Sequence, residues 1–355
     1  MHKEGTPEHA TWLDQVRETP LEPDLPICDP HHHLWDRQGH RYLLEELRTD
    51  LDCGHRIVST VFVECGADYR TEGPEAMRPV GETEFVEALA NRATAEGEPG
   101  LCAGIVGMAD CLLGSAVGEV LEAHRDASPR FRGIRHAAGW DESPAVRNSH
   151  TDPPRDLYRR PEFRRGFAEL APRDLSFEAW QYHHQLPLVT ELARAFPETS
   201  IILNHFSGPL GIGPWEGRRE EILECWRRDL AECARCPNVV AKLGGLLMPV
   251  NGFGFHKRER PPGSDEVVAA TGDWYRHAID CFGTDRCMFE SNFPVDRASV
   301  SAGVLWNAFK KIAADASPGE KADLFHDTAA RVYRLPASEQ GPGHRLGAAG
   351  TASLY

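Results

Sequence analysis

The 355-residue sequence lacks several features that would point to other classes of protein. It has no run of about 18 apolar residues, so we expect no membrane-spanning helix. Its first residues, MHKEGTPEHATWLDQ, lack the apolar core of a signal peptide. It also lacks an excess of basic residues. The formal net charge is −15, which argues against nucleic acid and anionic membranes as main partners.

Paired CxxC motifs, which would indicate a structural zinc site, are also missing. The ten cysteines are scattered, and the one CxxC, Cys233 to Cys236, stands in the helical context LAECARCPN without a second pair nearby. We interpret it as a helix end rather than a metal or redox site. Unpaired cysteines are typical of a reducing cytoplasm, which is the expected location.

The composition, 41% hydrophobic and 26% charged, is that of a globular protein. Residues 1–24 are polar and interrupted by prolines, so we expect an N-terminal arm there. Residues 25–335 carry the alternating strand and helix patterns of one domain. Residues 336–355 are rich in Gly, Ala and Ser and are expected to form a flexible tail.

Eight short apolar runs within this domain are predicted to be strands. They cover residues 27–33, 58–65, 104–110, 131–136, 175–180, 199–205, 239–245 and 287–294. Helical patterns such as LPLVTELARAFPE separate most of them, with apolar residues at three- and four-residue spacing. This alternation predicts an α/β fold, the (β/α)8 TIM barrel. The alternative is a doubly wound open sheet, but its first turn would be glycine-rich, and here that turn holds histidines.

The first strand ends in DPHHHLWD, which contains a His-x-His pattern. Successive side chains on a strand alternate between faces, so His31 and His33 point the same way and His32 points away. Two imidazoles side by side at a strand end can share a metal ion or bind a substrate.

Polar residues also stand at the ends of most other predicted strands, where a barrel places its active site. They include Glu64, Asp110, Arg135, His136, His205, Lys242 and Asn292. His205 would face the first-strand pair across the barrel mouth. Three neutral imidazoles are a common ligand set for Zn²⁺, Mn²⁺ or Fe²⁺, so His31, His33 and His205 are the candidate metal ligands.

Five residues are candidates for binding a small, anionic substrate. Arg135, in FRGIRH, suits a bidentate grip on a carboxylate, and Lys242 stands in an otherwise apolar strand and needs a partner or a cavity. His183 follows the fifth strand, His256 lies in a glycine-rich segment that resembles a lid, and Trp35 follows the histidine pair.

Together these motifs resemble the amidohydrolase superfamily, specifically its amidohydrolase-2 group of TIM-barrel hydrolases. The resemblance covers residues 25–335 and rests on DPHHHLWD, FRGIRH, ILNHFSGP, KLGGL and FESNFPVD. It implies that His31 and His33 occupy the first-strand HxH positions and that His205 matches the sixth-strand histidine. It also implies that Arg135 lies near substrate, as in lactonases of the group.

The sequence departs from this group on strand eight, where the usual GSDxP-like turn carries an aspartate and this chain has Asn292. In the group that aspartate ligates metal and takes the proton from water, and an amide can do neither well. The candidates for the missing base are Glu64, Asp296 and His183, in that order. Metal-free operation stays open.

The resemblance and the residues together predict a hydrolase that opens a lactone, or a related ester or amide, of a small carboxylated substrate. A first alternative is a metal-dependent non-oxidative decarboxylase of the same superfamily. A second is a non-catalytic binding protein on a decayed barrel, although a buried Lys242 argues against it. The sequence is also compatible with a homo-oligomer.

Overall fold

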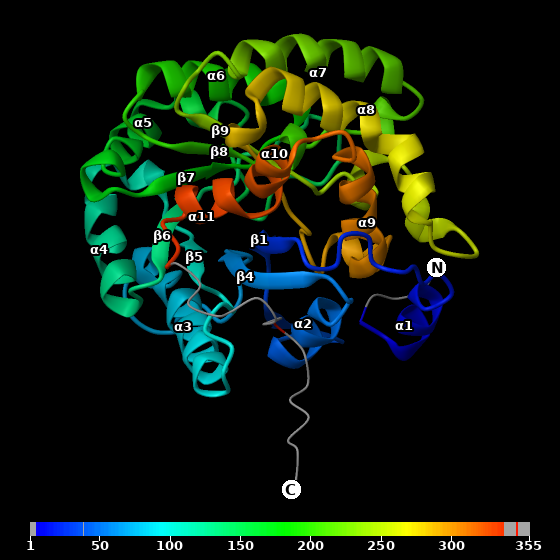
Figure 1. The fold of residues 1–355 in the computed structure, drawn as a ribbon. Coiled ribbons are helices and arrows are strands. Elements are labelled where there is room, and N and C mark those ends of the chain that lie inside the picture. The colour runs from blue at the N-terminus through cyan, green and yellow to red at the C-terminus, as the bar shows by residue number, and fades with distance from the viewer. Residues whose placement is uncertain (1–4, 38, 337–345, 347–355) are drawn as a thin grey trace, which may run out of the picture.

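The computed structural model describes residues 5–37, 39–336 and Leu346, and it contains one eight-stranded barrel (Figure 1). The strands are parallel and follow one another in chain order. An isolated parallel bridge between His32 and Phe293 brings the segment after the last strand back to the first. The barrel is therefore nearly closed. The predicted (β/α)8 fold is confirmed and the open sheet is excluded.

Each predicted strand overlaps one observed strand. The barrel strands are β1 (Pro26–His32), β4 (Arg56–Val63), β5 (Gly104–Gly107), β6 (Phe131–Arg135), β7 (Ser176–Ala179), β8 (Ile201–Leu203), β9 (Val239–Leu243) and β10 (Cys287–Phe289). A short antiparallel hairpin, β2 (Trp35–Arg37) and β3 (His40–Tyr42), follows β1.

Helices surround the barrel (Figure 1). They are α1 (Pro7–Leu13), α2 (Leu44–Leu51), α3 (Val80–Ala95), α4 (Val117–Ala127), α5 (Pro161–Phe167), α6 (Leu186–Ala195), α7 (Arg219–Cys233), α8 (Ser264–Phe282), α9 (Ala302–Ile312), α10 (Pro318–Ala322) and α11 (Thr328–Val332). Helix α6 illustrates the pattern, because its buried residues Leu186, Val189 and Ala193 recur on one face. The strands are continuous apolar runs because both of their faces are buried, one against the helices and the other in the barrel interior.

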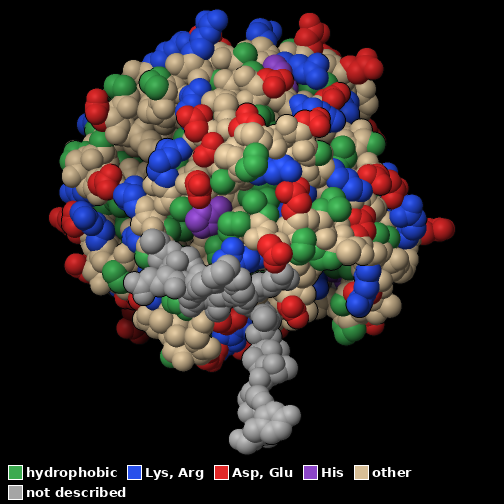
Figure 2. All heavy atoms as spheres, in the orientation of Figure 1, with side chains coloured by type: hydrophobic (Ala, Val, Ile, Leu, Met, Phe, Trp, Pro, Cys, Tyr) green, Lys and Arg blue, Asp and Glu red, His purple; other side chains and the backbone are tan. Residues whose placement is uncertain are grey.

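The N-terminal end of the barrel is closed by α11. Ala329, Val332 and Tyr333 pack against barrel residues such as Val61 and Met288 in one buried cluster. The Tyr333 hydroxyl donates a hydrogen bond to Glu178 of β7. Figure 2 shows this face, on which Lys and Arg side chains are interspersed with Asp and Glu. The end that remains for a functional site is the opposite, C-terminal end, where the fold predicts one.

Part of the expected N-terminal arm is helical and packs on the barrel. Trp12 of α1 is buried, and its indole N–H lies 3.1 Å from the Glu259 carbonyl oxygen. The Glu18 carboxylate accepts hydrogen bonds from the backbone and hydroxyl of Ser264 at 2.7 and 2.6 Å, at the start of α8. The tail expected at 336–355 lies outside the described residues, except for positions 336 and 346. Across the described residues, no helix combines the length and apolar character needed to cross a membrane.

Candidate active site

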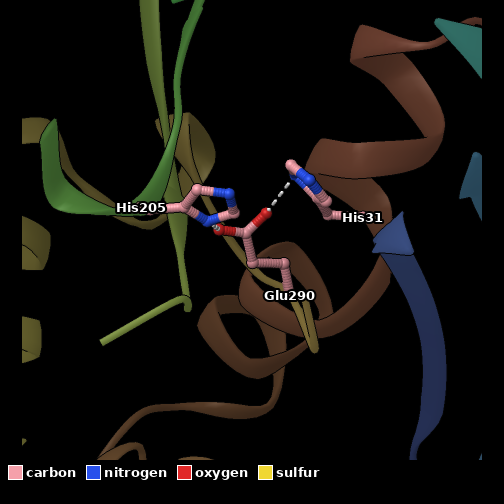
Figure 3. Close-up of side chains that lie close together, drawn as sticks. All are labelled: His31, His205 and Glu290. Carbon is pink, nitrogen blue, oxygen red and sulfur yellow. Dashed lines mark hydrogen bonds and ion pairs between the residues drawn. The ribbon is translucent and has the colours of Figure 1, made fainter. Parts of the chain in front are cut away.

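Three buried side chains meet at the C-terminal end of the barrel (Figure 3). His31 is the penultimate residue of β1, His205 follows β8 by two residues, and Glu290 directly follows β10. One nitrogen of each histidine and one oxygen of Glu290 all lie within 4.8 Å of one another. Figure 3 shows the Glu290 carboxylate between the two imidazoles.

The Glu290 carboxylate contacts each imidazole through a different oxygen. Oε1 lies 2.7 Å from His205 Nδ1, in hydrogen-bond geometry. Oε2 lies 2.9 Å from His31 Nδ1, but without hydrogen-bond geometry, so this buried oxygen has no hydrogen-bond partner among the described residues. An orphaned buried oxygen facing two imidazole nitrogens is the arrangement that a bound cation would complete.

Two adjacent glycines make room for this group. A Cβ on Gly244 would lie 2.4 Å from Glu290 Cγ, and a Cβ on Gly245 would lie 2.4 Å from His205 Nδ1. Gly245 also has φ +75°, which glycine adopts without strain. The KLGGL motif therefore serves the site sterically, because any larger residue at either position would displace a side chain of the group.

Burial sets the protonation of the group. It raises the pKa of Glu290 to about 8, helped by the nearby Glu178 carboxylate, although Lys242 works against the rise. Burial also lowers the pKa of both His31 and His205 well below the usual range, and Lys242 or Arg135 adds to the effect. Neutral imidazoles are the form that binds a metal, and a bound cation would displace the proton from Glu290.

Two buried ion pairs flank the group. Arg135 Nε lies 2.6 Å from Glu64 Oε1, and Lys242 Nζ lies 2.9 Å from Glu178 Oε2. Both cations also reach His31: Arg135 Nη1 lies 3.4 Å from Nε2, and Lys242 Nζ lies 3.3 Å from Nδ1. Across the described part of the chain, each of these cations has its own carboxylate and Glu290 forms no ion pair with Lys or Arg. A divalent cation therefore fits the charge of the site as well as its donor atoms.

His33 and Trp35 lie beside this group. The His33 ring centre is 4.9 Å from that of His31, and its Nδ1 is 2.7 Å from the Val63 carbonyl oxygen. It is not part of the group of three within 4.8 Å. Trp35 stacks on His33 at 5.9 Å. The predicted convergence therefore includes His33 as a neighbour, and its role as a metal ligand stays a prediction.

Asn292 and Asp296 form a separate pair behind the group. Asn292 Nδ2 donates a hydrogen bond to Asp296 Oδ1 at 3.3 Å, and the Leu247 N–H donates to the other carboxylate oxygen. Burial raises the pKa of Asp296 well above its usual range. The strand-eight carboxylate that reaches the two histidines is Glu290, two residues before the position where the family's aspartate was expected.

His183 and His256 lie further out. The Leu210 N–H donates to His183 Nδ1 at 3.3 Å, and the His183 ring packs 4.8 Å from that of Trp215. His256 is half-buried in the short helical turn Phe255–Lys257. Among the described residues, no hydrogen bond, ion pair or ring contact joins His183 or His256 to His31, His205 or Glu290, so their substrate-binding roles stay predictions.

Sequence reasoning missed two residues of this site, Glu290 and Glu178. The signal was present in both cases, since each is a carboxylate within or directly after an apolar strand, CMFE and LSFEAW. The same reasoning had selected Glu64 in VFVEC. On strand eight the resemblance places the usual aspartate at position 292 and therefore points to Asn292 instead of Glu290.

Comparisons with known proteins agree with this architecture. A family model described as Amidohydrolase matches residues 28–335. The uncharacterized protein y4mH of Sinorhizobium fredii is 34% identical over 334 residues, which cover 88% of this chain and 99% of that protein. An L-fucono-1,5-lactonase of Burkholderia ambifaria is 25% identical over 323 residues, which cover 88% and 97%.

A solved structure shares the fold. It is an amidohydrolase from Burkholderia multivorans crystallised with bound zinc, with a TM-score of 0.66 and 23% sequence identity, covering 87% of this chain and 99% of that chain. Because the family match covers most of the sequence and the barrel carries the matching motifs at its strand ends, the chain belongs to the amidohydrolase family.

Proposed function

We propose that this protein is a hydrolase that opens a lactone, or a related carbonyl ester, of a small carboxylated or polyhydroxylated substrate. The observation that carries the proposal is the buried His31–His205–Glu290 group at the C-terminal barrel mouth, with two buried cations beside it. The relatives named L-fucono-1,5-lactonase support a lactone as the substrate class.

His31, His205 and Glu290 would hold one divalent cation of the zinc, manganese or iron kind, with His33 as a further neighbour. Two nitrogens and one carboxylate oxygen are donors that these ions accept, and the zinc in the related structure supports the choice. When bound, such an ion polarises the substrate carbonyl and makes water more acidic.

The residues of this chain supply the rest of the chemistry. Glu290, which would be ionised once a bound cation displaces its proton, accepts the proton of the attacking water, since it is the carboxylate of the group and forms no ion pair with Lys or Arg of the described chain. Lys242 and Arg135 favour negative charge that develops on the carbonyl oxygen. Arg135 Nη1, which contacts His31 rather than Glu64, is the part of the guanidinium that would meet a substrate carboxylate.

The ten cysteines are all free and all lie in described residues. Thiols without disulfides are typical of a reducing compartment, which supports a cytoplasmic location.

The test combines metal analysis with product analysis on protein purified without chelator. We expect about one divalent ion per chain. We also expect the protein to release acid from L-fucono-1,5-lactone and from 2-pyrone-4,6-dicarboxylate, and a pH indicator measures this release. Ring opening consumes water and releases no CO₂. Release of CO₂ from aromatic carboxylates such as 2,6-dihydroxybenzoate, without lactone opening, would replace the proposal with the decarboxylase. Neither activity, with no bound metal, would favour the binding protein.

A further inference from the structure

The loop after β6 holds one histidine, His150, that the family motifs do not include. Hydrogen bonds on both sides fix the loop against the end of the strand. The Ser149 N–H donates to the Gly139 carbonyl at 2.8 Å, the Gly139 N–H donates to the Ser149 hydroxyl at 3.0 Å, and the Thr151 hydroxyl donates to the Ala137 carbonyl at 2.6 Å. His150 is thus held in place on a well-bonded loop at the barrel mouth.

His150 faces a buried carboxylate on one side and solvent on the other. Its Nε2 forms an ion pair with Glu64 Oε2 at 3.0 Å, and 37% of its side chain is exposed, whereas Glu64 is fully buried. The contact has ion-pair distance without linear hydrogen-bond geometry. Glu64 binds Arg135 through its other oxygen, and Arg135 reaches His31. His150 therefore lies at the rim of the same polar chain that ends at the proposed metal ligands.

We infer that His150 is the acid that protonates the leaving oxygen when the lactone ring opens. The inference rests on the proposed function and adds a catalytic residue to it. An imidazole supported by a carboxylate is the standard form of a general acid–base residue, and the contact with Glu64 uses Nε2, which leaves Nδ1 as the nitrogen that would donate the proton.

Water adds its oxygen to the lactone carbonyl carbon and gives one proton to Glu290. The bond between that carbon and the ring oxygen then breaks, and its electron pair stays on the ring oxygen. His150 gives its proton to this oxygen, which becomes an alcohol. His150 then takes a proton from solvent, and the proton held by Glu290 leaves to solvent, so one water is consumed and a hydroxy acid is formed.

The charges around His150 suit a proton donor. Glu64 raises the pKa of His150 above its ordinary value, in spite of partial burial, and Glu82 of α3 adds to the effect. The charge of Arg135 lowers the pKa of His150 and so opposes this rise. His150 in turn lowers the pKa of the neighbouring His136. As a result His150 stays cationic up to a higher pH than a free histidine does.

This role also narrows the substrate class. An alkoxide is a poor leaving group and needs a proton as the bond breaks, whereas a phenolate or enolate leaves without one. A built-in acid is therefore expected in an enzyme for aliphatic lactones, such as those of aldonic acids, and is superfluous for aryl or enol lactones.

The experiment compares His150→Gln with wild type on L-fucono-1,5-lactone and on dihydrocoumarin, whose leaving group is a phenolate. We expect kcat on the aliphatic lactone to fall about 10²-fold or more, and the fall in rate at alkaline pH to disappear from its pH–rate profile. On dihydrocoumarin we expect kcat to change only a few-fold. Metal content should not change. The control is His326→Gln, because His326 also pairs with a carboxylate, Asp327 at 2.8 Å, but does so beside α11 at the other end of the barrel.

A second variant separates chemistry from folding. In His150→Gly, added imidazole should restore part of the aliphatic activity, because the position is partly open to solvent. Equal losses on both substrates, or no loss on the aliphatic lactone, would overturn the inference and leave the proposed function standing. Failure of wild type to open either lactone would overturn the proposed function and the inference with it.

Discussion

Glu64 and Glu290 occupy matching positions and differ in almost everything else. Each lies just beyond a barrel strand, and each side chain is fully buried. Burial alone would raise the pKa of both. Arg135 and His150 instead lower the pKa of Glu64 far below its usual range, whereas Glu290, between two neutral imidazoles, has its pKa raised to about 8. Burial acts on both carboxylates alike, so the difference between their pKa values comes from their neighbours.

This difference in pKa changes which carboxylate is expected to act as the base. Glu64 was the first candidate for the base on sequence grounds, but it is held in two ion pairs. A carboxylate that is paired with a guanidinium is a poor proton acceptor at neutral pH. We therefore assign the base to Glu290 and a positioning role to Glu64, and the following variants test that assignment.

The largest effect is expected for Glu290→Gln. The change removes the carboxylate of the group while keeping its size, so metal should be lost on dialysis and kcat/KM should fall about 10³-fold. Elemental analysis and lactone kinetics measure the two effects. Full metal content together with full activity would show that Glu290 is neither ligand nor base.

The second variant, Glu64→Gln, is expected to act mainly on stability. It leaves the buried Arg135 without its charged partner, which costs about 3–5 kcal/mol of unfolding free energy. Urea unfolding measures this, and metal content should match wild type because Glu64 is not in the group of three. An unaltered unfolding free energy with complete loss of turnover would return the role of base to Glu64.

A third carboxylate, Glu82 of α3, extends the comparison. It accepts hydrogen bonds from the backbone N–H groups of Cys65 and Ala67. Burial, and then the neighbouring Glu64, raise its pKa to about 7 from the ordinary 4.5. Its native-state proton therefore contributes stability that is complete below pH 4.5 and is lost as the pH rises through about 7.

Glu82→Gln should remove this dependence. Between pH 4.5 and 7, the unfolding free energy of wild type relative to the variant should fall by up to about 1.4 kcal/mol per pH unit. Denaturant unfolding at a series of pH values measures the difference. A difference that stays flat over this range would mean that Glu82 is ionised throughout, like Glu64.

The strands were predictable because hydrophobic runs and helix periodicity are local properties. The same holds for His31, His205, Arg135 and Lys242, which interrupt apolar strands at their ends. The pairing of Lys242 with Glu178 was not predictable, since it depends on which side chains meet across the barrel. His150 was missed for a related reason: it lies 15 residues beyond the end of β6, and only the hydrogen bonds of its loop return it to the mouth.

Asn292→Asp is expected to leave the metal content unchanged, although the resemblance suggests a rise. The variant restores the family's residue, but in this structure the side chain at 292 meets Asp296, and Glu290 already supplies the carboxylate to the histidines. Aspartate tolerates the left-handed backbone at this position, φ +55°, so the fold should persist. The new carboxylate faces Asp296 without a cation and should cost roughly 1–3 kcal/mol of unfolding free energy. Metal content after dialysis should equal that of wild type, and a clear rise would show that position 292 turns toward the metal and that Glu290 does not replace it.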